Sequence, residues 1–259
     1  MLDGRLLRSF DLLWFLSLLA LAVAGILAIW STTSGTGLHS YFGRQMIFLV
    51  CGIAAFFVLL CFDYRLFSDY INIIYISSMA VLGVTILIGR AVGSNKSWLD
   101  LGAFSFQPSE FAKIIVIIAL AKYYAGLDSD HLSLKELAAG AAIVLIPITL
   151  VLLQGDLGTA VTFVPIYATL SFLAGVRRKH IIVVLLIAAV SAPIAWSAMH
   201  GYQKERIETI LNPSKDPDRV GYQTIQSMIA IGSGQFLGKG LKQGTQGYLG
   251  FLPARHTDF

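Results

Sequence analysis

Seven apolar runs, each close to the length that crosses a lipid bilayer, constrain this chain more than any other feature. They lie at about residues 10–30, 42–62, 70–89, 108–124, 137–154, 157–175 and 180–199. A transmembrane helix needs about 20 predominantly apolar residues. A soluble domain carries about 25% charged residues, whereas this chain carries 13%. The sequence therefore predicts an all-α, polytopic transmembrane helix bundle with seven spans.

The Lys and Arg residues between the runs predict the orientation, because cytoplasmic loops carry an excess of them. With the N-terminus in the cytoplasm, eight flank the inner ends of the runs and four flank the outer ends. The inner residues are Arg5, Arg8, Arg65, Lys122, Lys135, Arg177, Arg178 and Lys179, and the outer residues are Arg44, Arg90, Lys96 and Lys113.

This orientation puts the last 60 residues on the outer side. We expect residues 1–199 to form the transmembrane bundle and residues 200–259 to form an extracytoplasmic loop segment with amphipathic helices, as part of the same domain. Residues 221–234 place Tyr222, Ile225, Met228 and Ile229 on one helical stripe. That pattern suits a helix at the membrane surface, and equally one packed on the outer end of the bundle.

Residues 98–113, WLDLGAFSFQPSEFAK, contain a helix start. Pro108 suits the first helical position, and Glu110 suits the positive end of the helix dipole. Glu110 and Lys113 are spaced to pair on one face, although capping and pairing alone would explain them. Trp98 fits the aromatic belt at a membrane interface.

Asp156 stands in Gln154-Gly-Asp-Leu-Gly-Thr159, between the fifth and sixth runs. A carboxylate at membrane depth is costly and is usually functional or paired. Asp156 is also placed to cap the next helix. A cap, a buried ion pair and a catalytic or cation-binding role all remain open.

Two segments of the outer tail carry charge in a suggestive setting. Gly232–Gly240 resembles a phosphate loop but lacks the Walker spacing, so only weak anion binding by its backbone and Lys239 is indicated. Arg255, His256 and Asp258 place a cation, a titratable ring and a carboxylate within four residues. Such a trio suits acid–base chemistry beside a phosphate, but it is common in ordinary loops.

Taken together, these segments resemble the SEDS family (shape, elongation, division and sporulation), and within it RodA more than the division paralogue FtsW. Gly155 and Ala254 stand where the family often has Pro and Glu, which puts a carboxylate role at position 254 in doubt. The resemblance is carried by Trp98–Gly102, Phe106–Lys113, Gln154–Thr159, Asn212–Pro217, Gly221–Ser227, Ala230–Gly234, Gly238–Gly240 and His256–Phe259.

The resemblance implies a peptidoglycan glycosyltransferase of the bacterial inner membrane that serves cell-wall elongation and cell shape. Its implied substrate is lipid II, a disaccharide-pentapeptide on undecaprenyl pyrophosphate. Family members have ten spans with a large outer loop after the seventh, so we expect this chain to be truncated at its C-terminus.

The resemblance also implies site residues. Asp258 matches the family's essential acidic residue and is expected to be the catalytic base or the ligand of a divalent cation, Mg²⁺ or Mn²⁺. Charge and position make Arg206, Lys239 and Arg255 candidate pyrophosphate contacts. Trp98 is expected to shape the substrate cavity. The expected supporting residues are Asp156, Glu110 and Lys113.

The implied partners are a class B penicillin-binding protein transpeptidase, other membrane proteins of the elongation complex and membrane lipids, and no nucleic acid. An alternative is a lipid II flippase, because buried ionisable groups and broken helices suit a transporter as well. A scaffold that only positions a transpeptidase is a third possibility. The charged outer tail favours the enzyme, since a flippase needs no base there.

Overall fold

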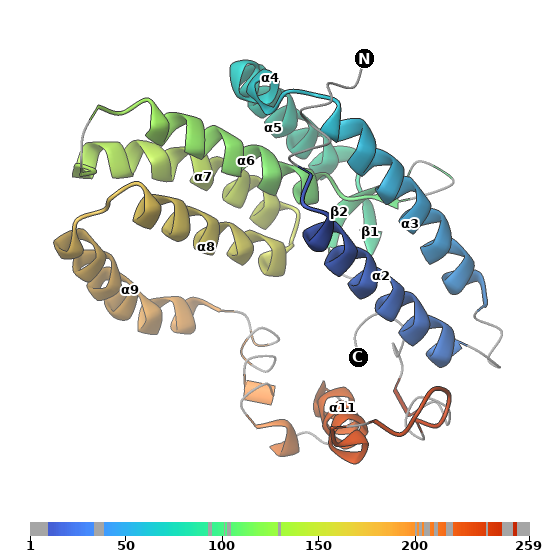
Figure 1. Cartoon of the computed structure of the whole chain (residues 1–259). Helices are drawn as coiled ribbons and strands as arrows, with labels where there is room; N and C mark the ends of the chain where they lie inside the picture. Colours follow the sequence, from blue (N-terminus) through green and yellow to red (C-terminus); the bar gives the residue numbers. More distant parts are fainter. Residues whose placement is uncertain are drawn as a thin grey trace. The chain divides into compact units, whose positions relative to one another are not determined.

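The computed structural model describes the chain as two compact units, Met1–Cys61 with Pro193–Phe259 (unit 1) and Phe62–Ala192 (unit 2), each considered by itself (Figure 1). The described residues are 10–33, 39–92, 95–100, 102, 105–128, 131–199, 201, 204, 208–209, 212–215, 220–236, 238–244 and 251–252.

Helices stand at all seven predicted runs. They are α2 (Leu12–Thr33), α3 (His39–Leu60), α5 (Ile71–Ile88), α6 (Pro108–Ala125), α7 (Leu134–Leu153), α8 (Leu157–Leu173) and α9 (Arg178–Ala198). The described part also holds α4 (Tyr64–Asp69), the 3₁₀ turn η1 (Pro213–Lys215) and α11 (Val220–Gly234).

The polytopic helical architecture is confirmed, and the chain is a multi-pass membrane protein. Among the described residues, four helices are long and apolar enough to span a bilayer: Leu12–Thr33, Tyr41–Leu60, Ile71–Ile88 and Leu134–Leu153. Helix α8 is apolar but has only 17 residues. The count of seven spans therefore stays a prediction.

The core of unit 2 lies between α5, α6, α7 and α8. It contains the fully buried Leu82, Val116, Leu120, Val151 and Phe163. Helices α6 and α7 approach closely at Gly140, because a Cβ there would meet the Tyr124 hydroxyl and lie 2.9 Å from its Cζ. The Tyr124 hydroxyl is hydrogen-bonded to Ser171 Oγ of α8 at 2.8 Å.

A proline inside α7 leaves a backbone carbonyl that another helix satisfies. Pro147 has no N–H, so the carbonyl of Ile143, four residues earlier, has no intrahelical donor. The Tyr75 hydroxyl of α5 donates to that oxygen at 2.7 Å. Since lipid offers no donors or acceptors, this bond lets α7 keep its proline within the bilayer.

The connection between α5 and α6 forms a small antiparallel sheet that the sequence pattern did not predict. Its strands β1 (Arg90–Val92), β2 (Asn95–Asp100) and β3 (Ser105–Phe106) pair in that order. Arg90 lies opposite Trp98, and Leu99 lies opposite Phe106. The Lys96 N–H donates to the Gln154 carbonyl at 2.9 Å, which fixes the sheet to the junction of α7 and α8.

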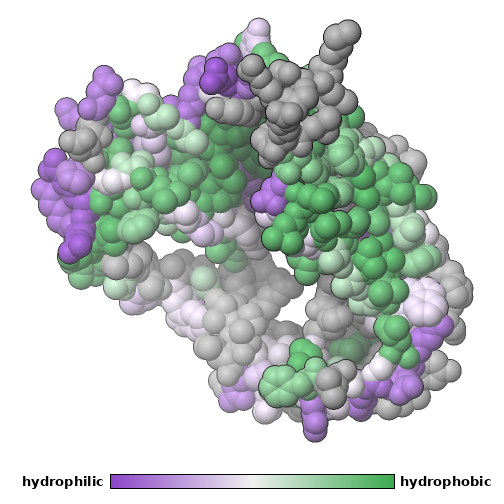
Figure 2. Space-filling model, viewed as in Figure 1, coloured by the Kyte–Doolittle hydropathy of each residue, from purple (hydrophilic) through white to green (hydrophobic). Residues whose placement is uncertain are grey.

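The opposite end of unit 2 is polar and basic. A parallel bridge joins Leu132, before α7, to Val176, between α8 and α9. Lys122 Nζ donates to the Ser68 carbonyl at the end of α4 at 2.6 Å. Figure 2 shows hydrophilic residues gathered at this end, at the left of the view, beyond the hydrophobic flanks of the helices.

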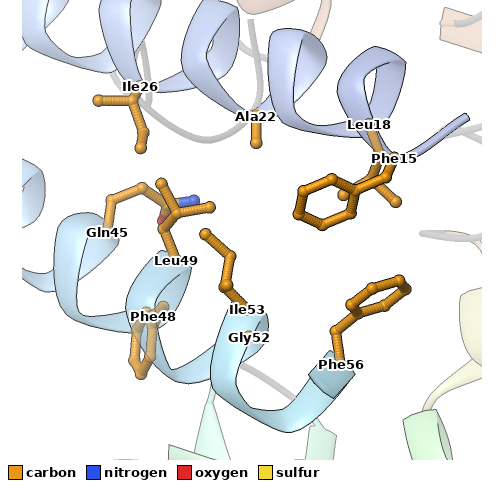
Figure 3. Close-up of a pocket in the computed structure, with 10 residues that line it drawn as sticks. All are labelled: Phe15, Leu18, Ala22, Ile26, Gln45, Phe48, Leu49, Gly52, Ile53 and Phe56. Carbon is orange, nitrogen blue, oxygen red and sulfur yellow. The ribbon is translucent and has the colours of Figure 1, made fainter. Parts of the chain in front are cut away.

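Within unit 1, α2 and α3 pack side by side and enclose an apolar groove of about 360 Å³. Its two ends differ in character. The Phe15 and Phe56 rings stack at one end with centroids 5.3 Å apart, and Ile26 and Gln45 lie at the other (Figure 3).

Helix α11 confirms the helix predicted in the outer tail. Ser227 is buried, whereas Met228, Ile229 and Ile231 are 63%, 44% and 76% exposed. An exposed apolar face suits a helix lying in a membrane interface. Both placements that the sequence left open, at the membrane surface or on the outer end of the bundle, stay predictions.

We predict that Gly140→Ala destabilises the protein by about 1–3 kcal/mol, the cost of overpacking a close helix contact. Thermal unfolding in detergent would measure it. Gly83→Ala is the matched control, because a Cβ at Gly83 in α5 meets nothing within 4 Å. An unchanged midpoint for Gly140→Ala would mean that α6 and α7 are not in this close contact.

Candidate functional site

Asp156 is held by three neutral donors at the start of α8. Its Oδ1 accepts the Thr159 N–H at 3.0 Å, and its Oδ2 accepts the Thr159 hydroxyl at 2.8 Å and the Gln107 amide at 3.1 Å. The residue is 9% exposed. No ion pair to Asp156 is formed within the described ranges. Asp156 therefore caps α8, one of the three roles that the sequence left open, and its hydrogen bonds offset the burial of the carboxylate.

The turn before Asp156 depends on Gly155. Its φ is +84°, a left-handed conformation that glycine adopts readily and that proline, fixed near −65°, cannot adopt. Gly155 therefore permits a turn at the junction of α7 and α8 that proline at this position would not allow.

Gln107 joins the motif at residues 98–113 to the motif at residues 154–159, and Gln154 connects the second motif to α5. Gln107 immediately precedes α6 and reaches Asp156. The buried Gln154 donates from Nε2 to the Leu82 carbonyl of α5 at 3.0 Å. The role of neither glutamine could be predicted from the sequence, because an amide shows no spacing pattern that would reveal its partner.

Trp98 and its neighbours lie on the sheet that is hydrogen-bonded to the junction of α7 and α8. Trp98 is half-buried on β2. Beside it, Arg90 forms an ion pair with Asp100 at 2.8 Å. The Gly102 N–H donates to Asp100 at 3.1 Å. This bond is the largest cause that lowers the pKa of Asp100 below its ordinary value of 3.8, and the hydrogen bond from Arg90 is the next largest.

The predicted pairing of Glu110 with Lys113 is confirmed at 2.8 Å. Both lie at the start of α6, which begins at Pro108 as predicted. The Lys113 side chain is only 24% exposed. Because exposed pairs at this spacing stabilise a helix by only a few tenths of a kcal/mol, the pair mainly orients charge at the site.

Lys239 lies in unit 1, in a tight loop after α11. It is exposed between Gly238 and Gly240, whose φ values are +70° and +94°. Three residues further on, the Lys242 ammonium lies 3.8 Å from the centroid of the Trp30 ring. The backbone N–H of Lys242 donates to Ser31 Oγ at 2.7 Å. The loop is thereby fixed to the C-terminal end of α2.

The structure places four predicted site residues at one end of unit 2 and Lys239 in unit 1, and the predicted role of every site residue stays a prediction. Trp98, Glu110, Lys113 and Asp156 gather at one end of unit 2. The predictions for Arg206, Arg255 and Asp258 fall outside the described residues. Within the described ranges, no three His, Cys, Asp or Glu side chains gather as metal ligands.

Comparison with known proteins assigns the chain to a family. Residues 5–259 match the family model of the FtsW, RodA and SpoVE proteins, described as cell cycle proteins. The chain belongs to the FtsW/RodA/SpoVE family. The resemblance that the motifs indicated is therefore confirmed.

Two relatives in the family carry informative names. Peptidoglycan glycosyltransferase MrdB of Escherichia coli K12 is 37% identical over 245 residues, which are 94% of this chain and 65% of MrdB. Peptidoglycan glycosyltransferase RodA of Treponema pallidum is 31% identical over 330 residues, covering 98% of this chain and 76% of that protein. The chain thus spans just under two thirds of the length of MrdB.

Two solved structures of the family share the fold. One comes from a peptidoglycan synthase complex described as coordinating polymerization and crosslinking. It matches with a TM-score of 0.71 and 31% sequence identity, and the match covers 83% of this chain and 64% of that one. The other is the rod shape determining protein RodA of Thermus thermophilus, with a TM-score of 0.60, 26% identity and coverage of 70% and 59%.

A double-mutant cycle tests the link between the two motifs. We expect Gln107→Ala and Asp156→Ala to be coupled by about 1 kcal/mol or more in unfolding free energy, since a hydrogen bond to a charged group contributes about 1.5–3 kcal/mol. Asp156→Ala combined with Asp63→Ala, which removes the cap of α4, should be additive within about 0.5 kcal/mol. Additivity in both cycles would contradict the Gln107–Asp156 bond.

The pKa of Asp100 gives a separate test. Because its folded-state pKa is depressed, the associated stability is present above pH 3.8 and is lost as the pH falls through the folded value. We expect Arg90→Gln to raise the pKa of Asp100 toward 3.8 without reaching it, as the Gly102 N–H remains. Carboxyl NMR titration measures this, and an unchanged pKa would refute the ion pair.

Proposed function

We propose that this protein is a peptidoglycan glycosyltransferase of the bacterial inner membrane, which polymerises lipid II during cell-wall elongation. One observation carries the proposal. The two motifs centred on Trp98–Lys113 and Gln154–Thr159 lie apart in sequence and meet at the Gln107–Asp156 hydrogen bond, in a family whose members include proteins named peptidoglycan glycosyltransferase.

The reaction needs a base and a way to stabilise a departing anion. An acceptor sugar hydroxyl attacks the anomeric carbon of the donor. A new C–O bond forms, the bond from that carbon to the pyrophosphate breaks, and the hydroxyl proton passes to a base. We assign the base to Asp258. The developing negative charge on undecaprenyl pyrophosphate would be stabilised by Arg206, Lys239 and Arg255.

Asp258 is the one residue that we propose as a ligand for a divalent cation, Mg²⁺ or Mn²⁺. The described residues offer no set of three acidic, His or Cys ligands. We assign the stabilisation of the leaving-group charge to the three basic residues. If a cation binds, it supplies additional positive charge to the pyrophosphate.

Unit 1 has a form that suits a substrate with an apolar tail and a charged head. Ile26 lines the groove between α2 and α3, and Trp30 lies one helical turn further on the same face. Lys242 covers the Trp30 ring, and Lys239 stands in the same loop. A prenyl chain in the groove would place its pyrophosphate near these lysines.

The distribution of charge supports an N-terminus in the cytoplasm. One end of unit 2 carries more basic residues than the other. That end has Arg65 in α4, Lys122, Lys135 and the run Arg177–Lys179, near the connections between helices. The other end has Arg90, Lys96 and Lys113. The positive-inside rule assigns the more basic end to the cytoplasm. In unit 1, the contact of Lys242 with the C-terminal end of α2 agrees with an extracytoplasmic segment 200–259.

The proposed partner is a class B penicillin-binding protein. The solved complex to which this chain is similar is described as coordinating polymerization with crosslinking, and crosslinking is the reaction of a transpeptidase. Other membrane proteins of the elongation complex remain part of the proposal through the resemblance alone.

A flippase is the second candidate, favoured by the prolines inside α7, α8 and α9. Prolines permit broken helices of the kind found in transporters. Flipping of lipid II in liposomes without polymerisation would support this candidate over the enzyme.

Polymerisation of lipid II by the purified protein tests the proposed enzyme. We expect glycan strands from the wild type and a loss of about 100-fold or more in rate for Asp258→Ala, the usual contribution of a general base. Asp128→Ala is the matched control, because Asp128 is an exposed carboxylate at the basic end of unit 2 and should polymerise normally. Strands from Asp258→Ala at the wild-type rate would overturn the catalytic assignment.

A further inference from the structure

We infer that a pocket between α5, α6 and α7 binds an anionic phospholipid. The pocket has a volume of about 310 Å³, which is within the range of small-molecule sites. It lies in unit 2, at the end where Lys122 of α6 contacts the end of α4, and away from Asp156. Its lining consists of Asn72, Tyr75, Ala119, Lys122, Tyr123 and Ile143.

Lys122 brings a positive charge to this lining. The residue is half-buried and forms no ion pair with any residue that the structure describes. Its Nζ donates to the Ser68 carbonyl at 2.6 Å and to the Asp69 carbonyl at 3.3 Å. An ammonium has three donors, and neutral carbonyls do not cancel its charge. Because a partly buried charge without a counter-ion is costly, a bound anion would stabilise Lys122 and accept its third N–H.

The acidic residues nearby do not supply that counter-ion. Asp69 meets Lys122 through its backbone carbonyl, and its carboxylate forms no ion pair in the described part of the chain. Glu136 meets the Tyr123 hydroxyl through its backbone carbonyl at 3.3 Å, while its carboxylate accepts the Ser133 N–H at 2.6 Å. The pocket therefore presents a net positive charge to a ligand.

The polarity of the pocket changes along the helices in the way that a phospholipid requires. Asn72 lies in the first turn of α5 and Lys122 in the last turn of α6. Ile143 lies nine residues into α7, which is about 14 Å from the start of that helix. Both α5 and α7 are long and apolar enough to span a bilayer. The pocket thus begins among polar groups at the membrane boundary and continues to the depth of acyl chains.

This gradient favours a lipid over a free anion. A headgroup phosphate beside Lys122 and the exposed Asn72 amide would let an acyl chain pass Ala119 and Ile143. Inorganic phosphate would gain nothing from burying those apolar side chains. Basic pockets between transmembrane helices bind lipid headgroups in other membrane proteins. The inference does not depend on the proposed glycosyl transfer.

Native mass spectrometry of the purified protein in mixed micelles tests the charge, with phosphatidylglycerol and phosphatidylcholine as probes. We expect the wild type to retain phosphatidylglycerol preferentially. Lys122→Gln should lower that affinity about fivefold, the contribution of one cation near an anionic headgroup, and Lys122→Arg should preserve most of it. Lys135→Gln is the charge-matched control, because Lys135 is exposed at the same end of unit 2 and does not line the pocket.

A second variant tests the cavity and leaves every charge in place. Ala119→Leu puts a larger side chain into the lining, so retention of phosphatidylglycerol should fall although Lys122 is present. Ala119 is only half-buried, so the larger side chain has room to fit without breaking the packing of α6. If Lys122→Gln fails to fold, this variant decides the matter, since unchanged retention would place the lipid outside the pocket.

Three other results would each overturn the inference. The first is equal retention of both lipids by the wild type. The second is a loss of affinity in Lys135→Gln as large as that in Lys122→Gln, which would indicate attraction by the whole basic surface. The third is protection of the wild type from heat by inorganic phosphate as large as that by phosphatidylglycerol, which would make the ligand a free anion.

Discussion

A carboxylate placed between two membrane helices needs hydrogen-bond donors, and the polar end of unit 2 meets this need for Asp156. Burial without donors would be too costly for the folded state. Thr159 and Gln107 supply three donors, and Gln107 can do so only because α6 begins beside the junction of α7 and α8. The same requirement explains Gln154, which fixes that junction to α5 and, through its carbonyl, to the sheet.

The two ends of unit 2 consequently differ in chemistry. The Asp156 end combines a buried, well-bonded carboxylate with an ion pair and the half-buried Trp98. The opposite end holds exposed cations around short connections. The proposed polymerisation takes place on one side of a bilayer, and the proposal assigns the substrate to the Asp156 end. The exposed cations at the other end fit a cytoplasmic surface.

The sequence predicted the helices well, because twenty-residue apolar runs leave few alternatives in lipid. It also predicted the Glu110–Lys113 pair and the start of α6 at Pro108, and it offered the Asp156 cap as one of three roles, since all of these follow from local spacing. It did not predict β1–β3 or the partners of Gln107, Gln154 and Tyr75. Those contacts join residues distant in sequence, and no periodic pattern marks them. The placement of α11, at the membrane surface or on the outer end of the bundle, stays a prediction.

The central claim is that the Trp98–Asp156 end and residues 200–259 face the same extracytoplasmic compartment. Single cysteines at Ser105, Ser214 and His131, in a protein whose Cys51 and Cys61 are replaced by serine, would test it with a membrane-impermeant maleimide on spheroplasts. The account predicts labelling of Ser105→Cys and Ser214→Cys before lysis and of His131→Cys only afterwards. Protection of Ser214→Cys while Ser105→Cys is labelled would place the proposed base and the pyrophosphate contacts on the wrong side of the membrane.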